Sequence, residues 1–251
     1  MTFVAYLGQL QWVLDRIRRE QADDIVAAGR LVADALDAGG ILHAFGTGHS
    51  HLIAHEAFYR AGGLSAVNPI LDERLIFLKG ALESTRAERE TGLAAAILAR
   101  EDVQPIDAAV IISNSGRNAV PVEMALELRA RGVKLIAITN LSQSSEMSSR
   151  HASGKRLFEL ADIAIDTCVP RGDAAVRLPG LDAPMGPSST VAGAAIMNSI
   201  IIEAASALLA RGKQPPILPS ANLDSTSEQT LRDRLGSYAA RIRYLDVGDL
   251  T

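Results

Sequence analysis

Three short segments of small polar residues have the composition of anion-binding loops. They read GTGHS (46–50), SNSG (113–116) and GPSST (186–190). Glycine lets backbone N–H groups approach an anion, serine and threonine add neutral donors, and a following helix N-terminus adds partial positive charge. The same residues also serve as ordinary helix caps and turns. Three segments of one composition at comparable positions favour the binding of phosphate.

Other anion-binding motifs fit the sequence less well. The first segment, GTGHSH, lacks the third glycine of a dinucleotide fingerprint and the Gly-Lys-Ser/Thr of a P-loop. No hydrolase elbow of the form G-x-S-x-G occurs. ATP and NAD are therefore disfavoured, and we predict a phosphate carried on a small molecule, with no cofactor.

Histidines in and after the first segment raise the question of a metal. His51 and His55 are spaced i, i+4 and could chelate an ion from one helix face. The sequence places no carboxylate or third ligand beside them, and His55-Glu56 lacks the second histidine of H-E-x-x-H. We therefore predict no metal site.

The elements that position these segments follow from hydrophobic spacing and from glycine and proline. Apolar spacing predicts two amphipathic helices within residues 1–37 and an irregular or partly helical excursion over 72–91. Short apolar runs predict strands at 41–45, 64–71, 108–112, 134–138 and 163–165. The other predicted helices span 49–61, 92–100, 121–131, 190–209 and 228–244.

Two strands joined by a helix over residues 108–138 form a βαβ unit, which implies a parallel sheet with helices on both faces. In such a sheet, ligands bind beyond the carboxyl ends of the strands. No long linker interrupts the chain, so we predict one doubly wound α/β domain over 1–251. It comprises N-terminal helices (1–37), an α/β core (38–212) and a C-terminal loop and helix (213–251).

Composition limits the partners and the compartment. The chain has 25 Lys+Arg against 29 Asp+Glu and no basic block, so nucleic acid is not expected. Its first 20 residues resemble neither a signal peptide nor a membrane span, and we expect no membrane. The single cysteine, Cys168, excludes an internal disulfide and has no basic neighbour that would activate it. A cytoplasmic location is expected.

Taken together, GTGHSH, YRAGGL, SNSGRNAVPVE and GPSST resemble the signature of sugar isomerase (SIS) domains over roughly residues 30–210. The form is similar to phosphoheptose isomerase and the N-acetylmuramic acid 6-phosphate etherase, and closest to a bacterial subgroup of single-domain SIS proteins. The resemblance implies a flavodoxin-like fold and a phosphosugar ligand, with Ser113, Ser115 and Asn118 nearest the phosphate. The predicted binding residues are Gly46, Gly48, His49, Ser50, Ser113, Asn114, Ser115, Gly116, Asn118, Ser188, Ser189 and Thr190.

The resemblance also bears on catalysis. The glutamate of the isomerases and the etherase lies about ten residues beyond the first-loop serine, where this sequence has Arg60 and carries its carboxylate at Glu56 instead. As a general base, Glu56 would remove the C2 proton of an aldose phosphate. His55 is the second candidate, for ring opening or proton transfer. Alternatively, Glu56 is a solvated residue or pairs with Arg60.

Two functions therefore stay open at this stage. One is an aldose–ketose isomerase, or a related lyase or deglycase, acting on a phosphorylated sugar or amino sugar. The other is a non-catalytic phosphosugar sensor. The N-terminal helices carry an apolar stripe with Trp12, and related domains pair, so we expect a homodimer or a dimer of dimers.

Overall fold

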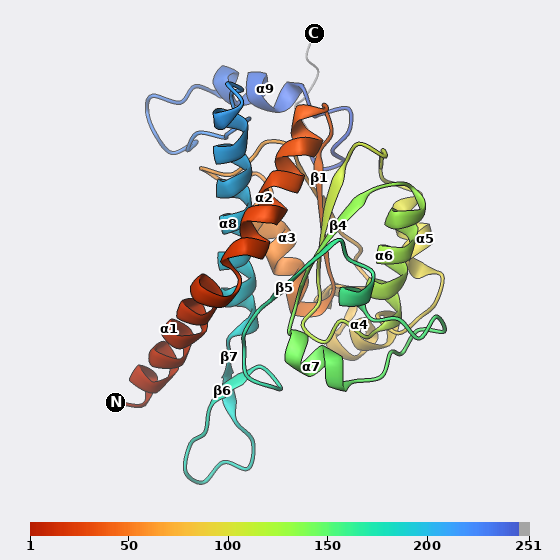
Figure 1. The fold of residues 1–251 in the computed structure, drawn as a ribbon, viewed down its shortest axis with the longest axis vertical. Helices are drawn as coiled ribbons and strands as arrows, with labels where there is room; N and C mark the ends of the chain where they lie inside the picture. Colours follow the sequence, from red (N-terminus) through yellow and green to blue (C-terminus); the bar gives the residue numbers. More distant parts are fainter. Residues whose placement is uncertain (246–251) are drawn as a thin grey trace.

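The computed structural model describes residues 1–245 and contains a five-stranded parallel sheet (Figure 1). The strand order is β2-β1-β3-β4-β5. The strands are β1 (Leu42–Gly46), β2 (Val67–Ile70), β3 (Ala108–Ile112), β4 (Lys134–Thr139) and β5 (Ile163–Asp166). The doubly wound α/β architecture and the five strands predicted from the sequence are confirmed.

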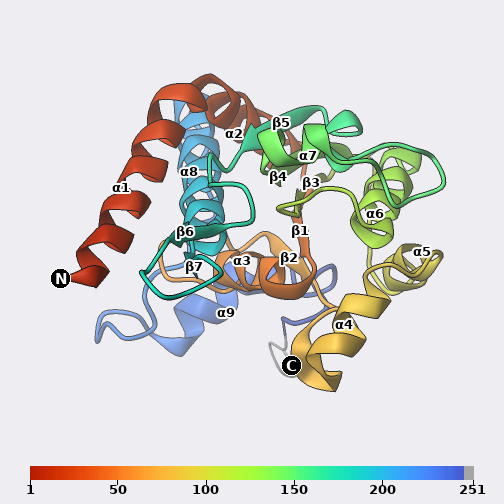
Figure 2. The same ribbon diagram turned by 90° about the horizontal axis from the view of Figure 1, so that it is seen from below.

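Helices cover both faces of this sheet, as Figures 1 and 2 show. One layer contains α1 (Thr2–Glu20), α2 (Ala22–Asp37), α3 (His51–Ala57) and α8 (Ser189–Ala210). The other contains α4 (Ala81–Ala87), α5 (Leu93–Leu98) and α6 (Ala119–Ala130). Because both faces are covered, β1 and β3 are buried along their whole length, which explains the continuous apolar sequence of β3 and the single polar residue, His43, within β1.

Small residues allow the first helix layer to pack closely. A Cβ on Gly29 of α2 would lie 2.3 Å from the Cβ of Glu203 on α8, and one on Gly193 of α8 would lie 2.3 Å from Ile53 of α3. By length and composition, α8 is the one helix in residues 1–245 that would suffice to cross a membrane. Its buried face packs against α2 and α3, while Val191, Ile202 and Leu209 on the same helix are exposed.

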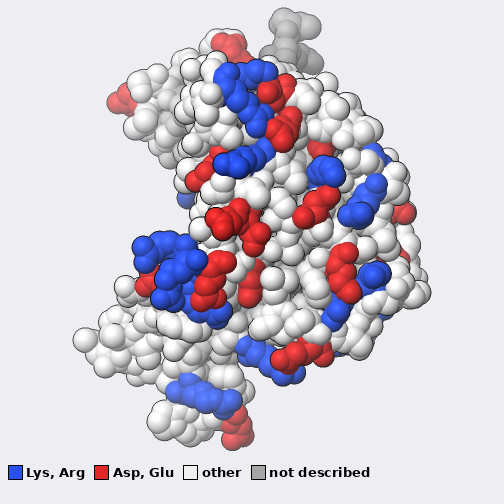
Figure 3. Space-filling view, viewed as in Figure 1, with Lys and Arg blue, Asp and Glu red and all other residues white. Residues whose placement is uncertain are grey.

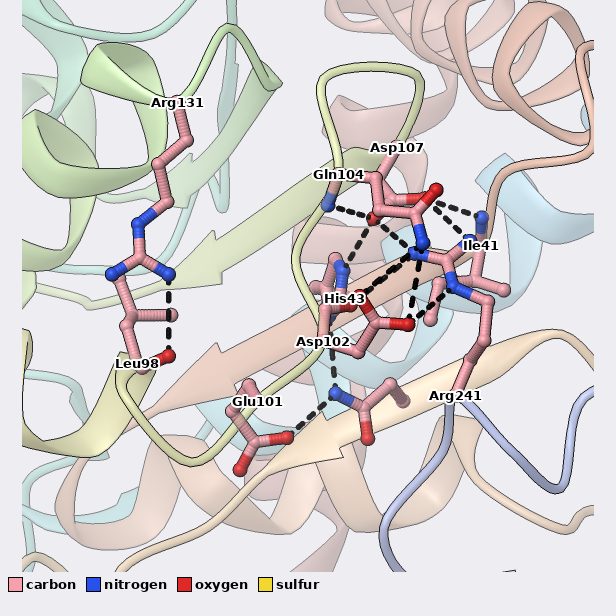
Figure 4. A network of polar contacts seen from close by, with 10 residues as sticks. Ile41, His43, Leu98, Glu101, Asp102, Gln104, Asp107, Arg131 and Arg241 are labelled. Atoms are coloured by element: carbon pink, nitrogen blue, oxygen red, sulfur yellow. Dashed lines mark hydrogen bonds and ion pairs between the residues drawn. The ribbon is translucent and has the colours of Figure 1, made fainter.

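A buried polar network lies at the amino edge of the sheet (Figure 4). Asp107, which precedes β3, accepts hydrogen bonds from the backbone N–H of Ile41 (2.9 Å) and from Arg241 Nη2 (2.8 Å), and contacts His43 Nε2 at 3.0 Å. Asn68 of β2 contacts the other ring nitrogen of His43 at 3.1 Å. The network therefore ties the C-terminal segment to the starts of three strands.

Charges of both signs are interspersed over the face of the molecule shown in Figure 3. Many of the charged side chains pair with each other, as Arg211 does with Asp34 and Lys134 with Asp162. On this face the structure has no extended region of a single sign.

Several elements differ from the sequence-based prediction. The helix predicted over 49–61 is a short turn (Gly48–Ser50) followed by α3, which ends at Ala57 because Phe58 is extended and Tyr59 has a φ of 47°. The helix predicted over 228–244 is α9 (Glu228–Gly236), followed by turns. Four elements were not predicted: α7 (Leu141–Glu146), the short 3-10 helix η3 (Leu157–Glu159), β6 (Ala174–Val176) and β7 (Met185–Pro187).

Candidate functional site

Two of the predicted segments lie side by side at the carboxyl edge of the sheet. We call residues 46–50 loop 1 and residues 113–118 loop 2. β1 and β3 are paired in register up to Gly46 and Ile112, so both chains leave the sheet at the same level. The helices that follow, α3 and α6, lie on opposite faces. This is the topological switch point, where doubly wound proteins bind ligands.

Loop 2 presents backbone N–H groups that donate no hydrogen bond within residues 1–245. Gly116 has a φ of 60°, which favours glycine, and its N–H donates to the Ser113 hydroxyl at 3.2 Å. Among residues 1–245, the N–H groups of Ser115, Arg117 and Asn118 have no hydrogen-bond partner. With the N-terminus of α6 beside them, these three N–H groups form what we call the loop 2 cradle, which suits an anion.

The two asparagines of loop 2 are hydrogen-bonded to neighbouring segments. Asn118 is 8% exposed, and its side-chain oxygen accepts a 2.8 Å hydrogen bond from Arg150 Nη1. The backbone oxygen of Asn114 accepts a 3.0 Å hydrogen bond from the N–H of Asn140, at the end of β4. Asn114 therefore positions the loop. The predicted ligand contact of Asn118 stays a prediction.

Loop 1 is a tight turn that requires glycine. A Cβ on Gly46 would lie 2.5 Å from the backbone of Ser50, and Gly48 has a φ of 53°. The N–H of Gly48 donates to the backbone oxygen of Leu75 at 2.8 Å, which fixes the turn against the excursion between β2 and α4. His49 is exposed and its ring lies 4.7 Å from that of Phe77. These contacts set the shape of loop 1 beside the loop 2 cradle.

Glu88 connects loop 1 to the start of α6, and no sequence pattern predicted this position for it. Its carboxylate accepts a 2.6 Å hydrogen bond from the buried Thr47 hydroxyl of loop 1. Its backbone oxygen accepts a 3.1 Å hydrogen bond from the N–H of Val120, in the first turn of α6. In the sequence, Glu88 is only one of several charged residues in an irregular stretch. A half-buried carboxylate at the switch point can serve as a general base.

Glu56 and His55 of α3 do not meet at the loop 2 cradle. Glu56 Oε1 lies 3.3 Å from Arg60 Nε, and its side chain is 33% exposed. His55 lines a separate cavity of about 490 Å³ at the β2 edge of the sheet. The ion pair that the sequence offered as an alternative for Glu56 is therefore present. The catalytic role of either residue stays a prediction.

The Lys and Arg side chains that line the cavity beside His55 each pair with a carboxylate. Asp72 pairs with Arg74 at 2.8 Å and with Arg100 at 2.6 Å, and Glu73 pairs with Lys79 at 3.2 Å. Hydrogen bonds from Arg74 and Arg100 hold the pKa of Asp72 well below its usual range, although burial opposes them. Each basic side chain of this cavity therefore has an acidic partner, although four basic residues share three carboxylates.

His51 is buried at the start of α3, where its Nδ1 contacts the backbone oxygen of Gly48. Burial lowers its pKa despite that contact, and the neighbouring His55 and His49 lower it further, so the imidazole is neutral at pH 7. In the part of the chain that the structure describes, no group of three or more His, Cys, Asp or Glu side chains converges in a way that could hold a metal ion.

The third predicted segment does not follow a strand of the main sheet, which corrects the expectation of three comparable positions. Ser188 follows β7, which pairs only with β6 in an antiparallel ribbon, and it precedes α8. Asp173, with a φ of 70°, accepts hydrogen bonds from the N–H groups of Ser188 (2.9 Å) and Ser189 (2.7 Å) and from the Ser189 hydroxyl (2.7 Å). Donors predicted to bind phosphate here already hold an internal carboxylate.

Known proteins share both the sequence and the fold. Residues 5–140 match the SIS domain family. A UPF0309 protein of Geobacillus kaustophilus is 39% identical over 227 residues, covering 90% of each chain. A UPF0309 protein of Streptomyces coelicolor is 44% identical over 234 residues, covering 92% of this chain and 93% of the relative.

Among solved structures, phosphoheptose isomerase GmhA from Neisseria gonorrhoeae has a similar fold, with a TM-score of 0.52 at 16% identity, covering 81% of this chain and 97% of that one. A phosphoheptose isomerase from Francisella tularensis has a TM-score of 0.50 at 16% identity, covering 80% and 95%. These likenesses concern the fold. The family match and the relatives together show that the chain belongs to the SIS domain family and is one of its UPF0309 members.

Proposed function

We propose that the protein binds a phosphorylated sugar at the switch point, with the phosphate in the loop 2 cradle. The observation that carries this proposal is that the N–H groups of Ser115, Arg117 and Asn118, at the start of a 12-residue helix, have no hydrogen-bond partner in the described part of the chain. Such a cradle suits a phosphate monoester. SIS family membership and the fold shared with phosphoheptose isomerases support it.

We further propose that the bound sugar reacts, by aldose–ketose isomerisation or a related elimination or deglycation. A carboxylate removes the C2 proton of the open-chain aldose phosphate, and the resulting enediol is reprotonated at C1. Glu88 is the base that the geometry favours, because it hydrogen-bonds to loop 1 and lies beside α6. Glu56 is the base that the sequence favours.

A panel of sugar phosphates tests both steps. Thermal melting is measured with hexose, amino-sugar, pentose and heptose phosphates and with their unphosphorylated parents. The best ligand is then incubated in D₂O with wild type, Glu88→Gln, Glu56→Gln and the exposed control Glu90→Gln. Binding of phosphorylated sugars alone, with deuterium uptake lost only in Glu88→Gln, supports the proposal. Loss only in Glu56→Gln moves the base to α3, and no stabilisation by any sugar phosphate overturns the binding site.

The pairing of Glu56 with Arg60 favours a second candidate function, a non-catalytic phosphosugar sensor. In the D₂O experiment, a sensor is stabilised by a sugar phosphate, but neither the wild type nor any variant exchanges a carbon-bound proton. A sensor also needs a partner that reads the bound state.

We also propose that the protein acts in the cytoplasm as a homodimer or a dimer of dimers. One side of α1 exposes Phe3 (59%), Leu7 (54%) and Leu14 (38%), which recur at four- and seven-residue spacing. A second copy that covers this stripe would remove the apolar side chains from water.

A further inference from the structure

Three arginines lie around loop 2 and form no ion pair with any of the residues 1–245. Arg117 belongs to the loop, and Arg150 is joined to it by a hydrogen bond from its backbone N–H to the Arg117 oxygen (2.8 Å). Arg150 also donates to Asn118, which precedes α6. Arg89 follows Glu88, whose backbone oxygen is bonded to the first turn of α6. In the described chain, the ion pairs are formed by other basic residues.

The positive charges of Arg117 and Arg89 act on the guanidinium of Arg150. Partial desolvation lowers the pKa of Arg150, and the charges of Arg117 and Arg89 lower it further, while Glu88 opposes them. The Nε of Arg117 is buried and has no hydrogen-bond partner among the described residues. Three positive charges and one negative charge leave an excess of two positive charges beside the loop 2 cradle. An uncompensated excess of this kind disfavours the folded protein unless an anion binds.

The basic side chains of the cavity beside His55 differ from these three arginines because each of them pairs with a carboxylate. There, Arg74 and Arg100 share the carboxylate of Asp72, and Lys79 pairs with Glu73. Around loop 2 the carboxylate of Glu88, whose charge acts on Arg150, instead accepts a hydrogen bond from the Thr47 hydroxyl. The arginines that form no ion pair within residues 1–245 therefore lie beside the N–H groups of loop 2 that have no hydrogen-bond partner there.

We propose that Arg89, Arg117 and Arg150 make the loop 2 cradle selective for a dianionic phosphate monoester over monoanionic and neutral groups; this inference rests on the proposed function. The two excess positive charges match a phosphate monoester, which carries about −1.5 to −2 at pH 7. Guanidinium N–H groups bind phosphate oxygens through charge-assisted hydrogen bonds, often in pairs. A sulfate ester has nearly the same shape and only one negative charge, so it binds weakly.

The test compares one sugar as its phosphate ester and as its sulfate ester. Dissociation constants for both are measured by calorimetry with wild type, Arg150→Gln, Arg89→Gln and Arg117→Gln, after melting curves establish that each variant is folded. Arg19→Gln, an exposed arginine on α1 in the opposite helix layer, controls for the change in net charge. We expect wild type to bind the phosphate ester about 10- to 100-fold more tightly than the sulfate ester. Each site variant is expected to reduce that ratio, and the control is expected to preserve it.

The outcomes separate this inference from the proposed function. The proposed role of the arginines is overturned if wild type binds the two esters with equal affinity. It is also overturned if the ratio of the two dissociation constants is unchanged in all three site variants. Either result leaves phosphosugar binding intact. If neither ester binds and no sugar phosphate of the panel stabilises the protein, the proposed function itself is overturned. Because Arg89 and Arg150 are exposed, their variants are expected to fold even if Arg117→Gln does not.

Discussion

The Thr47 hydroxyl donates a 2.6 Å hydrogen bond to the carboxylate of Glu88, 41 positions further along the chain. Thr47 is 5% exposed and belongs to the turn after β1, whereas Glu88 ends the short helix α4. The bond therefore connects loop 1 to the segment that lies against the start of α6. In the proposed reaction it holds the base in place, so Thr47 is a positioning residue.

Thr47→Val is expected to reduce the rate of deuterium exchange into the sugar by about 10- to 100-fold, because a misplaced base loses its alignment. The affinity for the sugar phosphate is expected to change little, since the loop 2 cradle is untouched. NMR measures the exchange and calorimetry the affinity. Thr85→Val is the control, because Thr85 is an exposed threonine of α4 that bonds only within its helix. A full exchange rate in Thr47→Val would mean that Glu88 needs no support from loop 1.

Asp173→Ala is expected to lower the free energy of unfolding by about 1–2 kcal/mol, as loss of a helix N-terminal cap does. The carboxylate accepts hydrogen bonds from two backbone N–H groups and one hydroxyl at the start of α8. Urea titration measures the stability, and Asp173→Asn, which keeps one oxygen acceptor, is expected to be milder. If sugar phosphate binds more tightly to Asp173→Ala, the predicted role of Ser188–Thr190 gains support, because the internal carboxylate then competes with the ligand.

Asp107→Asn is expected to lower the free energy of unfolding by about 3 kcal/mol at pH 7, because it breaks a buried ion pair. Burial raises the pKa of Asp107, but hydrogen bonds from His43, Arg241 and two backbone N–H groups outweigh it and hold the pKa at about 2. The folded-state pKa is below the unfolded one, so this stabilisation is complete above about pH 4 and is lost as the pH falls to about 2. The variant is therefore expected to lose less stability than wild type between these pH values.

Asp102→Asn is the control for this network, because Asp102 also pairs with Arg241 but is half exposed. Its replacement is expected to cost less than about 1 kcal/mol. Denaturant titrations from pH 2 to 7 compare the three proteins. Equal losses in the two variants at pH 7 would mean that the burial of Asp107 adds nothing to its pairing with Arg241.

The sheet could be predicted from the sequence because its signals are local. Each strand is a short apolar run, and each is followed by glycine or small polar residues at the turn. Loop 2 was recognised for the same reason, since SNSG lies directly between a strand and a helix. These features depend on neighbours only a few residues away.

Contacts between distant segments carry no comparable signal. Glu88 reaches Thr47 across 41 positions, and Arg241 reaches Asp107 across 134. Asp173 has a left-handed backbone conformation, which the neighbouring sequence does not predict for an aspartate. It contacts Ser188 because the unpredicted β6–β7 ribbon brings the two residues together. The partner of a charged side chain is decided by the fold, so the candidate base at the switch point became visible only in three dimensions.

Gly29→Ala is expected to lower the free energy of unfolding by about 2 kcal/mol, because a methyl group there would overlap with Glu203 on α8. The helices α2 and α8 must then separate, which disturbs the layer that covers β1. Gly8→Ala is the matched control: Gly8 is on exposed α1 and a Cβ there meets nothing within 4 Å, so it is expected to gain up to about 1 kcal/mol. A Gly29→Ala protein as stable as wild type would show that the two helices can move apart at no cost.

Leu7→Glu is expected to shift the protein toward the monomer, because it places a charge in the middle of the apolar stripe on α1. Light scattering coupled to size exclusion measures the mass at several concentrations. Gln9→Glu adds the same charge on another side of the same helix and is expected to leave the assembly unchanged. A wild type that is monomeric at every concentration would contradict the proposed homodimer, and a Leu7→Glu protein with unchanged mass would mean that another surface forms it. The phosphate affinity of a monomeric Leu7→Glu then shows whether the switch point of one chain is sufficient to bind the ligand.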